Sequence, residues 1–236
     1  QYLTFCECRR KFFMSYYRRL PSIETNQEHD DNINVNTTLN PTLRGDIVHK
    51  FCELYGPHLD VEELLNNIIA SYGLKPNKNI VGELLPYIDN YLKLYPSHFD
   101  AMYSEKEFYY HLEKGIIHGI IDRIYVMEGK IELIDFKTNK VRNLEDKLYI
   151  REKYSPQLQL YAQVCEDTLN LKVNKAALLL LDCGESIDVD ISKEEKENNI
   201  LSINDFMEFV LNYNDIESYN RGKNCSKYCP YYCLCN

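Results

Sequence analysis

The chain has 236 residues, a length that suits one sizeable α/β domain or two small ones. Its formal net charge of -9 argues against a general polyanion binder, although local basic segments and bound divalent ions can outweigh that average. No apolar run approaches the roughly 18 residues that a membrane helix needs, and no signal peptide is visible. We therefore expect an intracellular, cytoplasmic protein with no membrane partner.

The cysteines gather at the two ends of the chain. Three of the nine, Cys52, Cys165 and Cys183, stand among apolar residues and are expected to be small buried hydrophobes. The other six are Cys6, Cys8, Cys225, Cys229, Cys233 and Cys235. Because no secretory signal is visible, terminal clustering favours a metal or cluster site over a disulfide framework.

The first half of the chain reads mainly as helix. Residues 2–20 form an aromatic, basic pattern that predicts a helix, and the polar, Asn-rich residues 22–41 predict a loop. Residues 42–55 predict a second helix, which contains His49. Apolar residues at helical spacing predict core-facing helices over 60–72 and 79–94, and residues 104–112 predict a strand.

Residues 115–137 predict a β-hairpin. Two β-branched, apolar runs flank a Met-Glu-Gly-Lys turn at 127–130. Strand side chains alternate between faces, so Asp135 and Lys137 share one side, while Asp122 lies on the partner strand. Carboxylates resist crowding near a low-dielectric sheet unless a cation compensates them. The hairpin therefore predicts a site for a hard metal ion with a lysine beside it.

The second half returns to helix and strand. Ser155 and Pro156 are expected to open a helix that places Gln157 and Tyr161, four residues apart, on one face. An apolar run at 176–181 predicts a strand covered on both faces, and 186–191 a more exposed neighbour. Residues 193–213 predict a last helix. We therefore expect an α/β fold with a central mixed sheet flanked by helices.

Several separated motifs resemble those of the PD-(D/E)XK nuclease superfamily, in particular its RecB-like branch with a four-cysteine iron–sulfur cluster, whose members include CRISPR-associated and helicase–nuclease types. They span nearly the whole chain: Cys-Arg-Arg-Lys-Phe at 8–12, Gly-x-x-x-His at 45–49, Asp122, Asp-Phe-Lys-Thr at 135–138, Gln-x-x-x-Tyr at 157–161 and the terminal cysteines. Arg9 stands where the family usually has proline.

The resemblance implies a restriction-endonuclease-like core and roles for the residues of its site. His49, Asp122, Asp135 and the backbone carbonyl of Phe136 would hold Mg2+ or Mn2+. Lys137 would orient the attacking water or stabilise charge on the phosphate. Gln157 and Tyr161 would position the lysine and the strand being cut. Glu105 is a possible additional residue, and Glu107 competes for that role.

The resemblance also assigns the terminal cysteines. The family pattern is Cys-x2-Cys-x5-Cys, with Cys-Pro-Tyr at the middle ligand. Here Cys229 is followed by Pro and Tyr, and five residues separate it from Cys235, as in the pattern. Three residues, instead of two, separate Cys225 from Cys229. Together with Cys8 these would hold a 4Fe-4S cluster, and Cys6 and Cys233 would be spare. Structural zinc, which also takes four thiolates, is the alternative. Either centre would join the two ends of the chain.

The implied organisation is one RecB-like nuclease domain over 1–236, with a nuclease core at 42–192 and with 1–21 and 221–236 joined by the cluster. The implied activity is metal-dependent hydrolysis of DNA, with single-stranded ends as the preferred exonuclease substrate, in DNA repair, recombination or CRISPR adaptation. A helicase domain or subunit is a possible partner. Two alternatives stay open: a catalytically silent module that binds DNA or a helicase, and a zinc or iron–sulfur structural protein.

Overall fold

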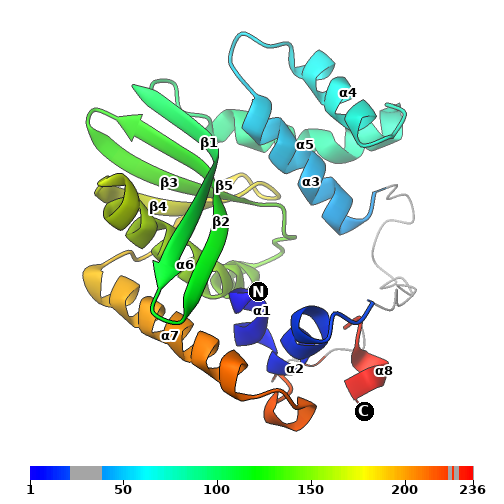
Figure 1. Ribbon diagram of the computed structural model, residues 1–236. Helices are drawn as coiled ribbons and strands as arrows, with labels where there is room; N and C mark the ends of the chain where they lie inside the picture. The colour runs from blue at the N-terminus through cyan, green and yellow to red at the C-terminus, as the bar shows by residue number, and fades with distance from the viewer. Residues whose placement is uncertain (22–38, 223–224, 226–228, 236) are drawn as a thin grey trace. The chain divides into compact units, whose positions relative to one another are not determined.

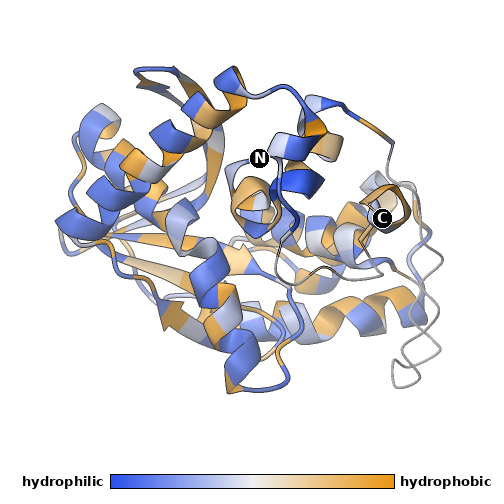
Figure 2. Cartoon of the chain, turned by 90° about the horizontal axis from the view of Figure 1, so that it is seen from below, coloured by the Kyte–Doolittle hydropathy of each residue, from blue (hydrophilic) through white to orange (hydrophobic). Residues whose placement is uncertain are grey.

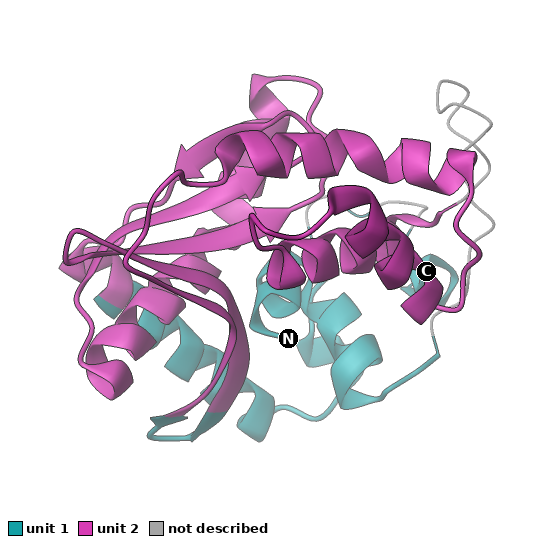
Figure 3. Ribbon diagram, turned by 90° about the horizontal axis from the view of Figure 1, so that it is seen from above, with its two compact units in different colours: residues 1–35, 111–116, 197–236 teal, residues 36–110, 117–196 magenta. Residues whose placement is uncertain are grey.

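The computed structural model describes residues 1–21, 39–222, 225 and 229–235. The chain divides into two compact units (Figure 3). The smaller unit comprises 1–35, 111–116 and 197–236, and the larger unit comprises 36–110 and 117–196. The loop predicted over 22–41 falls largely outside the described residues, and its last residue, Pro41, begins a helix.

A mixed sheet of five strands confirms the predicted fold class (Figure 1). The strand order is β1-β2-β3-β4-β5, with bounds β1 Ala101–Leu112, β2 Gly115–Met127, β3 Lys130–Lys137, β4 Val173–Leu180 and β5 Glu185–Asp188. Strands β2 and β3 pair antiparallel, β3 and β4 parallel, and β4 and β5 antiparallel. The parallel pair is joined by a helical crossover, as such connections require.

The β2–β3 hairpin was predicted correctly, turn included. Met127 pairs with Lys130, and the two residues between them, Glu128 and Gly129, have φ of 51° and 74°. Positive φ at both positions is the type I′ conformation, whose twist matches that of the strands it joins. Arg123 pairs with Ile134, so one step further along this register Asp122 lies opposite Asp135 on the same face.

Three helices cover one face of the sheet in the larger unit. They are α3 Pro41–Leu54, α4 Val61–Ser71 and α5 Lys78–Leu94, begun by the N-caps Asn40, Asp60 and Asn77. Their buried residues form one core with alternate strand residues, among them Tyr125, Ile134, Phe136, Ala177 and Leu179. This alternation leaves the intervening strand residues, Asp135 included, on the opposite face.

Helix α6, Leu144–Leu169, contacts β3 and β4 and is longer than the sequence predicted. It begins after the N-cap Asn143 rather than at Ser155, and Pro156 lies inside it. Residues on both sides of the proline, such as Ile150 and Leu158, are buried. The free energy gained by burying this face outweighs the loss of the backbone hydrogen bond that the proline cannot donate. In the turn before Pro156, the Ser155 hydroxyl donates to the Arg151 carbonyl.

The smaller unit has an aromatic core. The single helix predicted over 2–20 is instead α1 Tyr2–Glu7, α2 Arg9–Phe12 and a π-helical turn Phe13–Tyr17. The break is at Cys8, whose backbone is extended and whose thiol accepts from the Lys11 amide, as an N-cap does. Buried Phe5, Phe12, Phe13 and Tyr219 pack with partly buried Phe206 and Phe209.

The remaining helices complete the chain. Helix α7 spans Lys193–Asn212, followed by a 3-10 turn Ile216–Ser218 and α8 Tyr232–Cys235. Polar and apolar residues alternate along most helices (Figure 2), as expected of helices with one buried side. Within the described part of the chain, no helix combines the length and the apolar character that spanning a membrane would take.

Candidate active site

Two carboxylates face each other on the β2–β3 hairpin. Asp135 is completely buried, and the Asp122 side chain is 13% exposed. Asp122 Oδ2 accepts a hydrogen bond of 2.9 Å from the Phe136 amide. Asp135 forms an ion pair with Lys137 Nζ, yet neither of its oxygens receives a well-oriented hydrogen bond from the described residues. A buried carboxylate in this state lacks the partners that would compensate it.

The charges of the cluster do not balance. Burial, and next the charge of Asp135, raise the pKa of Asp122 to about 8, against the opposing effects of Lys137 and the Phe136 amide. Burial alone would lower the pKa of Lys137, but Asp135 and Asp122 outweigh it and the pKa is raised. One ammonium therefore serves two carboxylates, and an additional cation would favour the charged form of both.

His49 on α3 completes the group. Its Nδ1 lies 3.5 Å from Asp122 Oδ2, and its ring meets that of Phe136 edge-on at 6.1 Å. Burial lowers the pKa of His49, although Asp135 opposes this. A neutral imidazole beside carboxylates is a form that binds divalent metals. The structure thus brings together His49, Asp122, Asp135 and Phe136, the four predicted metal ligands.

A cavity of about 850 Å³ opens beside these residues. Its lining comes from α3, β1, β2, β3, the loop after β3, and α6, and includes His49, Glu105, Asp122, Phe136 and Lys137. Asp135 is not part of the lining, in keeping with its complete burial. A substrate in the cavity would therefore meet His49, Asp122 and Lys137 directly.

The structure separates the two glutamates that competed for a role on β1. Glu105 lines the cavity, and its φ of 47° is a left-handed conformation within β1, which runs from Ala101 to Leu112. Burial raises the pKa of Glu105, and the nearby carboxylates Glu53 and Asp135 raise it further. Glu107 is exposed, where it contacts His118 at 2.7 Å and accepts from Tyr109. Glu105 is therefore the one that belongs to the carboxylate cluster.

Gln157 and Tyr161 share a face of α6 and bond to each other. Gln157 Nε2 donates to the Tyr161 hydroxyl at 2.7 Å, and the Tyr161 ring packs edge-on against Phe108. Burial raises the pKa of Tyr161, and next the charge of Asp135 raises it further. Neither residue is among those that line the cavity.

Sequence reasoning missed other residues of the cavity. Lys137 Nζ lies 4.2 Å from the centre of the Tyr154 ring, a cation–π contact. Tyr154 is seven residues before Tyr161, but a helix that begins at Ser155, as the sequence predicted, leaves it out. Glu53 also lines the cavity, one helical turn after His49, and pairs with Lys50 at 2.7 Å. The i, i+4 spacing from His49 is a signal that could have identified it.

The predicted cluster cysteines all lie in the smaller unit. Burial raises the pKa of Cys235, and among its neighbours Cys229, Cys8 and Cys225 raise it further. The Cys8 thiol accepts from the amides of Gly222 at 3.2 Å and Lys11 at 3.4 Å. The four predicted ligands are therefore electrostatic neighbours, and one of them already has donors suited to a thiolate.

The donor sets fit the expected groups in chemistry. Imidazole and carboxylate oxygens suit Mg2+ or Mn2+, and four thiols suit an iron–sulfur cluster or zinc. Judged on the described residues alone, no three His, Cys, Asp or Glu side chains yet stand in a metal-binding arrangement.

Comparison with known proteins gives a consistent result. The family model of the PD-(D/E)XK nuclease superfamily matches residues 1–236. An ATP-dependent helicase/nuclease subunit from Lactobacillus delbrueckii subsp. bulgaricus is 40% identical over 80 residues, covering 33% of this chain and 6% of the relative. The subunit of the same name from Streptococcus mutans is 28% identical over 163 residues, covering 63% of this chain and 13% of the relative. The matched segments are thus a small part of those proteins.

Among solved structures, protein VC1899 from Vibrio cholerae aligns with 72% of this chain and 57% of its own, at 11% identity and a TM-score of 0.27. That similarity is too low to support an inference.

Proposed function

Because this chain belongs to the PD-(D/E)XK nuclease superfamily, we propose that it hydrolyses DNA phosphodiester bonds with the aid of Mg2+ or Mn2+. The observation that carries the proposal is the buried Asp135, which shares a single ammonium, that of Lys137, with Asp122. Two carboxylates and a neutral imidazole beside one ammonium call for a further cation. A divalent ion would supply it, and when bound would act as a Lewis acid on the phosphate.

Each side chain has a defined part. His49, Asp122, Asp135 and the carbonyl of Phe136 would hold the ion, with Glu105 as an additional ligand at the cavity wall. Lys137, held by Asp135 and under the Tyr154 ring, donates to the phosphate oxygen on which charge builds or orients the attacking water. Gln157 and Tyr161 would position that lysine and the DNA strand being cut; they bond to each other, and the Tyr161 ring packs against Phe108 on β1.

We propose single-stranded DNA ends as the substrate and exonuclease action as the form. The basis is the resemblance to the RecB-like branch and the similarity to helicase/nuclease subunits, because a helicase produces single strands. A helicase domain or subunit is accordingly the proposed partner. Repair, recombination or CRISPR adaptation would be the setting.

We further propose a 4Fe-4S cluster on Cys8, Cys225, Cys229 and Cys235, with zinc as the alternative. In support, Cys235 interacts electrostatically with the other three, and Cys8 accepts two amide hydrogen bonds. The cluster would join the ends of the chain, 1–21 and 221–236, while 42–192 forms the nuclease core. Ligand bonds of this kind offset the entropy of closing a long loop.

The deciding experiment is cleavage of end-labelled single-stranded DNA, with and without Mg2+ or Mn2+, by the wild type and Asp135→Asn. We expect metal-dependent shortening from an end by the wild type and none by the variant. Binding without cleavage at any metal concentration would support the silent DNA-binding module. Neither binding nor cleavage would leave the structural-protein alternative.

A further inference from the structure

A second group of polar residues lines the same cavity, apart from the carboxylates. Arg44 lies in the first turn of α3, and Thr138 and Lys140 lie in the loop that follows β3. Gly45 allows the close approach of the two segments, since a Cβ there would lie 3.2 Å from Thr138 Oγ1. The α3 terminus also presents the positive end of its helix dipole to this wall.

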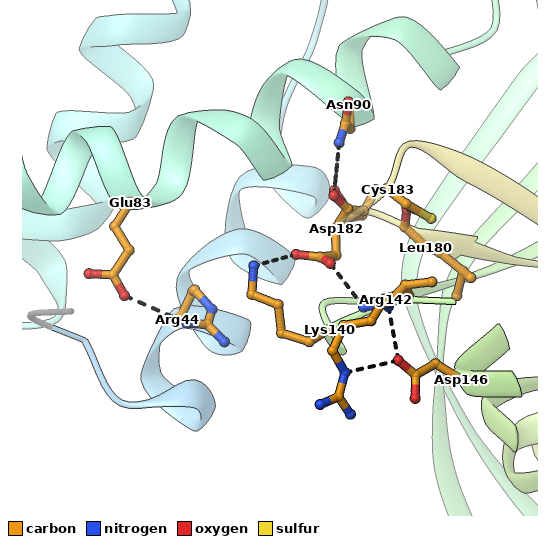
Figure 4. A network of polar contacts seen from close by, with 11 residues as sticks. Arg44, Glu83, Asn90, Lys140, Arg142, Asp146, Leu180, Asp182 and Cys183 are labelled. Atoms are coloured by element: carbon orange, nitrogen blue, oxygen red, sulfur yellow. Dashed lines mark hydrogen bonds and ion pairs between the residues drawn. The ribbon is translucent and has the colours of Figure 1, made fainter. Parts of the chain in front are cut away.

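Two of these residues are cations that share one aromatic ring. The guanidinium carbon of Arg44 is 5.5 Å, and the ammonium of Lys140 5.6 Å, from the centre of the Tyr87 ring. Their carboxylate partners differ: Arg44 pairs with Glu83 at 3.6 Å, and Lys140 with Asp182 at 2.7 Å (Figure 4). Both cations also line the cavity, so an anion there would meet positive charge from two segments of the chain.

Arg44 is not fully satisfied by its ion pair. Its residue is only 9% exposed, it lines the cavity, and its Nε has no hydrogen-bond acceptor among the described residues. An unsatisfied buried donor is costly. A tetrahedral anion bound beside Arg44 would supply an acceptor, and a guanidinium is the group that suits phosphate.

The loop does not need the Lys140 charge to stay in place. Asp182 also accepts from the Val141 amide at 2.9 Å, and Asn90 donates to the Leu181 carbonyl at 3.0 Å. The Lys140 side chain is 66% exposed, so its ammonium can turn from Asp182 to a ligand without unburying anything. Asp182 and Asn90 therefore hold this region through backbone groups, whether or not Lys140 is paired.

We propose that Arg44, Thr138 and Lys140 form a subsite for a second backbone phosphate of the DNA strand, next to the scissile one. The cavity has room for it, because about 850 Å³ is near the upper end of the ~300–1,000 Å³ range of ligand sites. This subsite rests on the proposed function for its ligand, and it holds the strand while the carboxylate cluster does the chemistry.

The test compares Arg44→Gln and Lys140→Gln with the matched control Arg142→Gln. Arg142 lies in the same loop but pairs with Asp146 and does not line the cavity. Binding of a labelled single-stranded oligonucleotide is measured by anisotropy in EDTA, where no metal supports cleavage, across a salt series. We expect each subsite variant to bind about tenfold more weakly with a salt slope smaller by about 0.7, the value for one phosphate contact on a single strand.

Kinetics with Mn2+ should show a raised KM with kcat within about twofold of the wild type, since the contact holds the strand equally before and during the reaction. A neutral methylphosphonate one linkage from the cut should weaken the wild type by the same factor and leave Arg44→Gln no weaker. Lys140, being exposed, gives a variant that folds even if Arg44→Gln does not, and a melting curve checks both.

The outcomes separate the two proposals. Unchanged affinity and KM in Lys140→Gln, or an equal loss in Arg142→Gln, would overturn the subsite and leave the nuclease standing if cleavage persists. Loss of affinity confined to the subsite variants, in a protein that cuts no DNA, would support the phosphate subsite and overturn the proposed catalysis.

Discussion

Removing one charge from the carboxylate cluster should stabilise the metal-free protein while abolishing the proposed DNA cleavage. The change is Asp122→Asn, which keeps an oxygen to accept from the Phe136 amide. The pKa of Asp122 rises from 3.8 to about 8 on folding. Because the folded value is the higher one, this cost is absent below pH 3.8, grows as the pH rises through the interval, and is complete above about pH 8.

The magnitude follows from that interval. pH 7 lies about three units above the unfolded-state pKa of Asp122. At ~1.36 kcal/mol per unit, the charged carboxylate therefore lowers the free energy of unfolding by about 4 kcal/mol at that pH. Water entry and relaxation around the charged form reduce this, so we expect a stabilisation of about 2 kcal/mol, or a Tm higher by about 4–8 °C for a chain of this size.

Thermal unfolding in EDTA at pH 5 and pH 8, followed by circular dichroism, measures the effect. The gain should be larger at pH 8, and saturating Mn2+ should reverse the order because the wild type alone gains binding energy. Asp89→Asn, on the exposed side of α5, serves as the control. A variant less stable than the wild type at pH 8 in EDTA would refute the reasoning.

Three other changes test separate parts of the molecule. Lys137→Ala should keep Mn2+ binding by calorimetry and lose at least about 10²-fold in kcat, as when one stabilising group is deleted; lost metal binding with retained turnover would contradict its role. Cys8→Ser should remove the iron and visible absorbance of anaerobically purified protein and speed proteolysis of residues 2–20, whereas Cys6→Ser should not; the opposite pattern would mean that Cys6 is the ligand. Gly222→Ala would put a Cβ 2.4 Å from the Glu7 carbonyl, so it should lower the iron content; wild-type iron content would show that this close approach is dispensable.

The hairpin could be predicted because its signals are local. Alternating apolar residues set the strands, and the Glu128–Gly129 pair sets the turn, so the facing of Asp122 and Asp135 follows from short-range rules. What brings His49 to within 3.5 Å of Asp122 is the docking of α3, a contact that no local pattern encodes. There the resemblance to a family supplied what periodicity could not.

The errors have physical causes of the same kind. Pro156 ordinarily marks a helix start, but here burial of α6 against β3 and β4 carries the helix back to Leu144. No signal in the sequence marks a helix break at Cys8. The backbone there is extended, and the Cys8 thiol accepts a hydrogen bond from the amide of Gly222, a residue more than two hundred positions away in the sequence. Strand alternation places Glu105 and Glu107 on the same side, so the sequence could not separate them, and in the structure only Glu105 of the two lines the cavity.

The parallel pairing of β3 with β4 has a consequence for biosynthesis. In this pairing Ile131 is the partner of Val173, and Lys137 is the partner of Leu180. Strand β3, which carries Asp135, therefore has neighbours on both sides only after β4 has been synthesised. Contacts so distant in sequence form late, after the intervening α6 has been made. A nascent chain released early would therefore lack the arrangement of Asp135 and Lys137. The proposed site therefore takes its final arrangement only after β4 has been made.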